Sequence, residues 1–129
     1  MKNEFIPYEQ ALALKELGFD EPCFGYYVSF ADNKEIPFKL IQIQSEKEQF
    51  KWVDNVCHAP TFSQSFRWFR EKYGLISYIH PLALLQDTKK WCYEITDFSN
   101  NWDESFNLHF PEEAELECLI RLIEMAKNK

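Results

Sequence analysis

The strongest hydrophobic pattern in the chain predicts an amphipathic helix over residues 61–73. Aromatic residues recur there at spacings of four, three and four positions, which places them on one stripe of a helix. These residues are Phe62, Phe66, Phe69 and Tyr73. Thr61 and Gln64 have the spacing of a capping box at the start, and Gly74 suits a left-handed stop at the end. We therefore expect the aromatic stripe to be buried.

Two further segments are predicted to be helices, and each follows a proline. Pro7 precedes residues 8–17, which Gly18 ends. Pro111 precedes residues 112–127, where acidic residues fill the first turn and a lysine closes the last, as the helix dipole favours. The apolar stripe of this last helix is wider than one sheet face normally covers. It predicts contact with a second helix or with a second copy of the chain, most simply in a homodimer.

Between the helices the pattern changes to alternation and to short runs of aromatic and β-branched residues, which predicts strands. Six segments fit, namely 23–30, 36–43, 49–53, 75–80, 90–96 and 102–109. Strands follow one another directly instead of alternating singly with helices, which favours antiparallel pairing. The predicted fold class is α+β, an antiparallel sheet of about five or six strands with three helices in the order α-ββ(β)-α-ββ(β)-α.

Length and composition are typical of one folded domain over residues 1–129. A chain of 129 residues can bury a core without disulfides or a metal, and a hydrophobic content of 46% opposes disorder. The three glycines, Gly18, Gly25 and Gly74, form no phosphate-binding or dinucleotide-binding loop. The sequence therefore predicts no nucleotide cofactor held by a glycine-rich loop, and no other cofactor is indicated.

The charge and the cysteines restrict the partners and the compartment. A net charge of -7 opposes binding to a nucleic acid polymer and is compatible with a soluble binder or with a basic protein partner. The four cysteines form no CxxC pair, and the sequence shows neither a signal peptide nor an apolar run of roughly twenty residues. We expect a cytoplasmic protein with four reduced thiols and no membrane association.

Three segments resemble small uncharacterised proteins carried by phages, prophages and genomes of Bacteroidetes-type bacteria. They are FIPYEQALALKELGFDEPCF at 5–24, APTFSQSFRWFREKY at 59–73 and EAELECL at 113–119. The resemblance covers the three predicted helices and no predicted hairpin. It implies a genomic setting, and it implies no activity and no catalytic residue.

Reactive residue types occur in few combinations that suggest chemistry. Cys57 and His58 are adjacent and could supply a nucleophile and a base, but neighbours in a chain usually point apart. A metal site built from them with His80 or His109 lacks the short paired spacing that zinc favours. The polar and aromatic segment 97–103 reads as a turn that could shape the rim of a pocket. We predict no catalytic residue, no metal ligand and no enzyme activity.

Two classes of function remain. The first is a non-enzymatic binding protein that holds a small anionic aromatic ligand, such as a nucleotide-derived signal, which in a phage setting would be sequestered as counter-defence. Its predicted ligand-binding residues are Arg67, Trp68, Arg70, Trp91 and Trp102. Arginine can pair with phosphate while indole stacks on a base, although Trp68 alternatively packs under a sheet edge. The second class is a protein interaction or inhibitor module without a small ligand, which docks through its acidic surface or its last helix.

Overall fold

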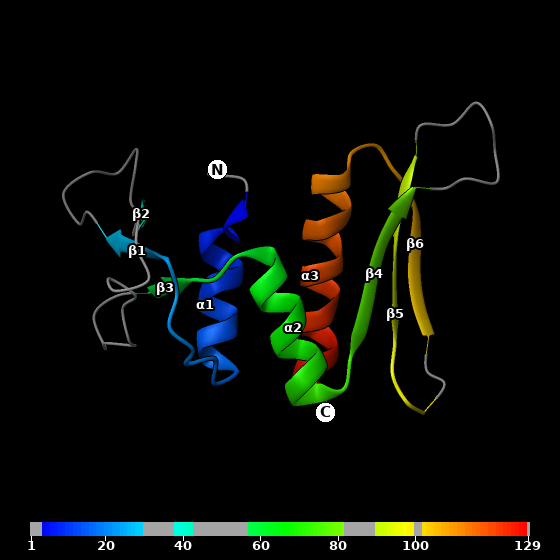
Figure 1. Cartoon of the computed structure of the whole chain (residues 1–129), viewed down its shortest axis with the longest axis horizontal. Coiled ribbons are helices and arrows are strands. Elements are labelled where there is room, and N and C mark those ends of the chain that lie inside the picture. The colour runs from blue at the N-terminus through cyan, green and yellow to red at the C-terminus, as the bar shows by residue number, and fades with distance from the viewer. Residues whose placement is uncertain (1–3, 30–37, 43–56, 82–89, 100–101, 129) are drawn as a thin grey trace. The chain divides into compact units, whose positions relative to one another are not determined.

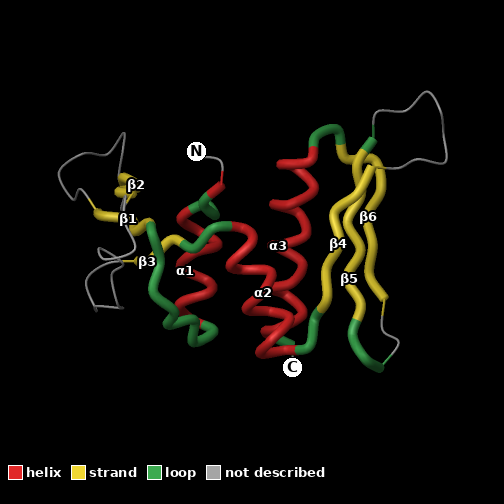
Figure 2. The backbone as a smooth tube through the Cα atoms, in the orientation of Figure 1, coloured by secondary structure: helices red, strands yellow, loops and turns green. Residues whose placement is uncertain are grey.

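A computed structural model of the chain describes residues 4–29, 38–42, 57–81, 90–99 and 102–128 (Figure 1). The elements follow in the order α1 (Tyr8–Glu16), β1 (Gly25–Ser29), β2 (Phe38–Gln42), β3 (Cys57–Ala59), α2 (Phe62–Tyr73), β4 (Ile76–Pro81), β5 (Trp91–Thr96), β6 (Trp102–Leu108) and α3 (Pro111–Lys127). Figure 2 shows these helices in red and these strands in yellow. The structure confirms the α+β class and the order of elements. The strand predicted over 49–53 lies outside the described residues.

The strands form two antiparallel sheets of three, where the sequence suggested one larger sheet. Their orders are β2-β1-β3 and β4-β5-β6. Each sheet belongs to one of two compact units of the chain, Met1–Ser63 and Gln64–Lys129. The boundary between the units falls in the first turn of α2. The single domain inferred from the sequence stays a prediction.

In the first unit, the segment before α1 is fixed to the sheet by its backbone. The amide of Ile6 donates to the carbonyl oxygen of Pro60 at 3.0 Å, and the hydroxyl of Tyr27 donates to the carbonyl oxygen of Ile6 at 2.7 Å. Gly25 opens β1 where a Cβ atom would lie only 2.7 Å from the ring of Phe5. Buried apolar residues of this unit are Phe5, Ile6, Ala11, Leu14, Phe19, Cys23, Cys57, Ala59 and Phe62.

In the second unit, α3 packs against all three strands of the sheet β4-β5-β6, as Figure 1 shows. Arg121 of α3 donates to the carboxylate of Asp103 on β6 and forms a second ion pair with Glu124 one turn on. The apolar face of α3 is closed by Ala114, Cys118, Leu119, Leu122, Ile123 and Ala126. Sheet and helix therefore share one core, which the Arg121 pair with Asp103 closes at the rim.

The helix α2 has the bounds predicted from the sequence, but the face that is buried differs from the predicted one. Phe69 is fully buried and Phe62 is 9% exposed, whereas Phe66 and Tyr73 are only half-buried. The buried side also includes Ser65 and Trp68. Gly74 ends the helix with a φ of 67°, in the left-handed region that favours glycine. The burial expected for the stripe is therefore complete only for Phe69 and nearly so for Phe62, because the inward face is rotated toward Trp68.

Candidate functional site

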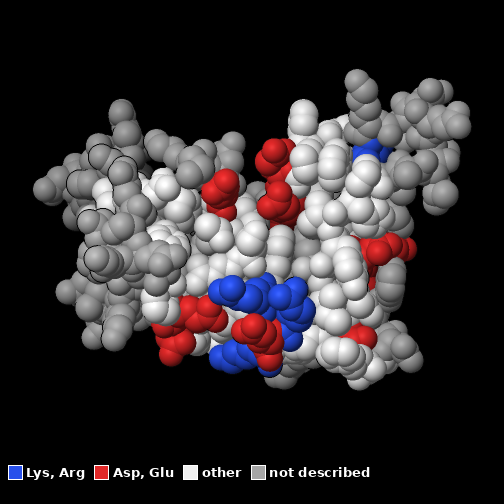
Figure 3. All heavy atoms as spheres, in the orientation of Figure 1, with Lys and Arg blue, Asp and Glu red and all other residues white. Residues whose placement is uncertain are grey.

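The exposed side of α2 carries the predicted arginines. Arg67 and Arg70 are both exposed, and a separation of three residues places their side chains next to each other on a helix. Lys72 and Glu71 are exposed on the same helix. Figure 3 shows basic side chains gathered over α2 with acidic side chains beside them. Three cations against one carboxylate give this helix a local positive charge in a chain of net charge -7.

Trp68 lies apart from this exposed side. The indole is only 5% exposed and makes edge contacts to Phe69 and Tyr73, with ring centroids 5.1 and 5.6 Å away. The ammonium of Lys72 lies 5.0 Å from the centre of the indole, a cation–π contact. The ring therefore has almost no surface left for a ligand, in agreement with the burial that the alternative required; the sheet edge expected above Trp68 stays a prediction.

Trp91 and Trp102 are placed far from each other by the register of the second sheet. Trp91 pairs with Leu108, and Trp102 pairs with Thr96. Trp91 and Thr96 are the two ends of β5, so the two tryptophans are separated by roughly 17 Å along the strands. Among the predicted binding residues whose side chains the structure describes, Arg67 and Arg70 are the exposed pair that lies together on one helix.

The structure adds one aromatic residue to the basic helix, Phe98. It follows β5 in a turn where the carboxylate of Asp97 accepts the amide hydrogen of Ser99 at 2.8 Å. The ring of Phe98 is 84% exposed and lies beside Gly74, because a Cβ atom on that glycine would be 3.7 Å from the ring. Phe98 belongs to the segment 97–103 in which the sequence indicated a rim, but its position beside α2 depends on tertiary structure.

The adjacent Cys57 and His58 do not form a catalytic pair. Successive side chains of a strand point to opposite faces, and both residues are buried on β3. The Cys57 thiol lies 3.9 Å from the carbonyl oxygen of His58. Burial raises the pKa of Cys57, and burial together with the charge of Lys15 lowers the pKa of His58. Both side chains are thereby kept neutral, which suits packing.

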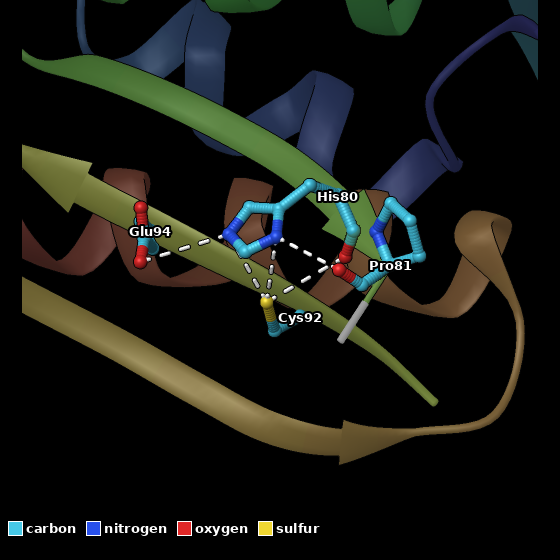
Figure 4. Close-up of polar contacts among 4 residues, drawn as sticks. All are labelled: His80, Pro81, Cys92 and Glu94. Atoms are coloured by element: carbon cyan, nitrogen blue, oxygen red, sulfur yellow. Dashed lines mark hydrogen bonds and ion pairs between the residues drawn. The ribbon is translucent and has the colours of Figure 1, made fainter. Parts of the chain in front are cut away.

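A different cluster of reactive side chains lies on the second sheet, where His80 and Cys92 are direct partners across β4 and β5 (Figure 4). The sulfur of Cys92 is 3.2 Å from Nε2 and 3.4 Å from Nδ1 of the His80 ring. Nδ1 lies 3.1 Å from the carbonyl oxygen of Pro81, which favours a hydrogen on Nδ1. Nε2 lies 3.6 Å from a carboxylate oxygen of Glu94. A thiol, an imidazole and a carboxylate thus lie together, and these are the group types of a catalytic nucleophile, its base and an acid that orients the base.

The electrostatics of this cluster oppose nucleophilic chemistry. Burial is the main factor that raises the pKa of Cys92, and the charges of Glu94 and Glu104 raise it further. Reactive cysteines instead lie near cations that stabilise the thiolate. The Cys92 residue is also fully buried, so an electrophile would first have to displace its neighbours. We interpret the contact between His80 and Cys92 as structural.

Metal ligation has no geometric support in the part of the chain that the structure describes. No three His, Cys, Asp or Glu side chains among those residues come together in a way that could hold a metal ion. His109, a candidate ligand in the sequence, has its Nδ1 3.3 Å from the ammonium of Lys90. A cation in that position competes with a metal for the ring nitrogen.

Comparisons with known proteins identify no relative of this chain. The chain matches no protein-family model, no curated protein and no solved structure. Among the described residues, no helix has the length and apolar character needed to cross a membrane. The candidate site therefore rests on the geometry of α2 and the turn beside it.

Proposed function

We propose that this chain is a non-enzymatic binding protein that recognises an anionic group through Arg67 and Arg70 on the exposed side of α2. One observation carries the proposal, namely that Arg67 and Arg70 are exposed and stand three positions apart on a helix whose opposite side is buried. Paired arginines bind phosphate or carboxylate by two parallel hydrogen bonds each. The chain as a whole is acidic and repels anions. The local positive charge on α2 therefore also directs an approaching anion to this helix.

The cysteine and histidine clusters support a function without covalent chemistry. Burial raises the pKa of each of the four thiols, which disfavours the nucleophilic thiolate. Binding at α2 requires none of them. In a cytoplasm where phage and host compete, such a binder would lower the free concentration of a nucleotide-derived signal by holding it.

Calorimetric titration with inorganic tripolyphosphate and a panel of linear and cyclic nucleotides tests the proposal. Arg70→Ala should weaken binding at least tenfold, or about 1.4 kcal/mol, and the double charge reversal Arg67→Glu with Arg70→Glu should abolish it. Lys127→Ala is the matched control, because Lys127 is an exposed cation of α3. If no anion binds, or if binding survives the double reversal, the proposal is wrong.

A protein interaction module is the second candidate, and the position of Trp68 favours it. Trp68 is buried, and the register of the second sheet places residues 91 and 102 at opposite ends of β5, so the indole expected to stack on a ligand between the arginines is not available. Exposed arginine and aromatic side chains are enriched at the centres of protein interfaces. Binding of an acidic protein that the double reversal abolishes, in the absence of any nucleotide binding, would favour this candidate.

A further inference from the structure

We propose that Phe98 is the ring on which the ligand of α2 stacks, so that the ligand is a nucleotide and not a simple phosphate. This inference rests on the proposed function, because it assigns the aromatic part of a ligand whose anionic part is held by Arg67 and Arg70. The sequence suggested tryptophans for this role, and the structure places an exposed ring, that of Phe98, beside Gly74 at the end of the helix that carries the arginines.

The position of Phe98 relative to the arginines is given by Gly74, which follows the last residue of α2. Gly74 comes four residues after Arg70 and seven after Arg67, so all three lie on one face of the helix. The amide of Gly74 still donates to the carbonyl oxygen of Arg70 at 3.1 Å, which continues the helical spacing to the glycine. With a rise of about 1.5 Å per residue, Gly74 is about 6 Å beyond Arg70 along the axis. The ring of Phe98, which lies beside Gly74, is therefore at the C-terminal end of the helix that carries both arginines.

Gly74 and the turn after β5 place the ring. A Cβ atom on Gly74 would be in ordinary van der Waals contact with two ring atoms, at 3.7 and 3.9 Å, so the ring lies directly against the end of α2. The opposite side of the turn is held by the bond from the Ser99 amide to Asp97, and the Thr96 hydroxyl donates to the Asp97 carbonyl oxygen at 3.2 Å. The aromatic ring is thus positioned by backbone and yet 84% exposed.

Exposure of this degree is unusual for phenylalanine and suits stacking. A base has a π-face whatever its identity, so stacking on Phe98 would tolerate different bases. The nearest carboxylate in sequence, that of Asp97, accepts a hydrogen bond from within its own turn. A ligand with its base on Phe98 and its phosphates toward Arg70 and Arg67 satisfies the order of groups along the helix.

The test compares two ligands that share a polyphosphate and differ in the base, ATP and inorganic tripolyphosphate, by calorimetry at one fixed ionic strength. Phe98→Ser should weaken ATP binding about tenfold and leave tripolyphosphate binding unchanged. Arg70→Ala should weaken both. Phe110→Ser is the matched control, because Phe110 is 64% exposed beside α3, and it should change neither. Equal melting temperatures of the variants establish that each is folded.

The outcomes separate the inference from the function on which it rests. If ATP and tripolyphosphate bind the unaltered protein equally well, or if Phe98→Ser weakens neither or both equally, the stacking role is overturned while anion binding stands. If neither ligand binds the unaltered protein, the proposed function fails, and the stacking role fails with it.

Discussion

Tyr27 and Ile6 are joined by a hydrogen bond of 2.7 Å from the phenol to the backbone carbonyl oxygen, across 21 positions of the chain. The ring of Tyr27 also receives an edge contact from Tyr8, with centroids 5.5 Å apart. One side chain of β1 therefore holds the segment before α1 and the first turn of α1 itself. Within the first unit, removal of the single phenolic oxygen of Tyr27 tests this tertiary contact.

Tyr27→Phe removes only that oxygen. Because the carbonyl oxygen of Ile6 loses a part-buried donor, the free energy of unfolding should fall by roughly 1 kcal/mol. Urea denaturation measures the loss, and Tyr78→Phe is the control, since Tyr78 is 52% exposed on β4 and should change stability by less than about 0.5 kcal/mol. Equal effects of the two substitutions would contradict a specific role for the bond.

The two phenylalanines of α2 should differ in their contribution to stability. Phe69 is fully buried, so Phe69→Ala should cost roughly 3 to 5 kcal/mol through lost burial and the cavity left behind. Phe66 is half-buried, and Phe66→Ala should cost about 1 to 2 kcal/mol. Urea denaturation of both variants under one condition decides the ranking. A larger loss for Phe66 would show that the aromatic stripe, and not the rotated face, is the buried one.

The four cysteines should be reduced and poorly reactive in the folded protein. All four are buried and form no disulfide in the structure, which describes every one of them. Alkylation by iodoacetamide should be more than about tenfold slower in the native protein than in urea, and titration in urea should give four thiols. A count of two thiols in non-reducing urea would establish a disulfide and contradict this prediction.

Stability should decrease at alkaline pH. Burial raises the pKa of Cys23 and of Cys118 from 9.0 to about 12, so the folded state keeps protons that the unfolded chain releases. The stabilisation is complete below pH 9 and is lost as the pH rises toward 12, by up to ~1.4 kcal/mol per pH unit for each thiol. Urea denaturation with a reductant at several pH values measures the slope. Cys118→Ala should make it shallower, and an unchanged slope would contradict the assignment.

Self-association through α3 stays a prediction with a direct measurement. Leu116 and Ile120 are half-buried, while Ile123 is 5% exposed and belongs to the core of its unit. If the first two form a dimer interface, light scattering at micromolar concentration should give the mass of two chains, and Ile120→Glu should give one. Glu112→Gln, which alters an exposed residue of the same helix, should leave the dimer intact. A mass of one chain for the unaltered protein contradicts the prediction.

Local signals were sufficient for the helices, because the determinants of a helix lie within a few residues. Pro111 occupies the first turn of α3, and Gly18 and Gly74 have φ values of 99° and 67°, as their stop positions required. The inward face of α2 was harder to predict, since it depends on what the helix meets and not on its own pattern. Hence Trp68 is buried although the aromatic periodicity placed it off the stripe.

Contacts between strands could not be predicted from the sequence. His80 faces Cys92 only because β4 and β5 pair in one particular register, and a shift by one residue would separate them. Likewise, the distance between Trp91 and Trp102 and the position of Phe98 beside Gly74 are consequences of pairing and packing. In a candidate site assembled from residue types alone, the two arginines therefore share one helix, whereas positions 91 and 102 lie at opposite ends of paired strands.

The close approach of Phe5 to Gly25 has a consequence for how the two positions evolve. A methyl group at position 25 would meet two carbons of the Phe5 ring at 2.7 and 2.9 Å and the carbonyl oxygen of Ala59 at 3.3 Å. The ring can be replaced by a smaller side chain, whereas the carbonyl is part of the backbone. In a population that varies freely at both positions, alleles with a side chain at 25 should survive selection only when a residue smaller than phenylalanine stands at 5. The two positions, twenty residues apart, should thus evolve as a pair.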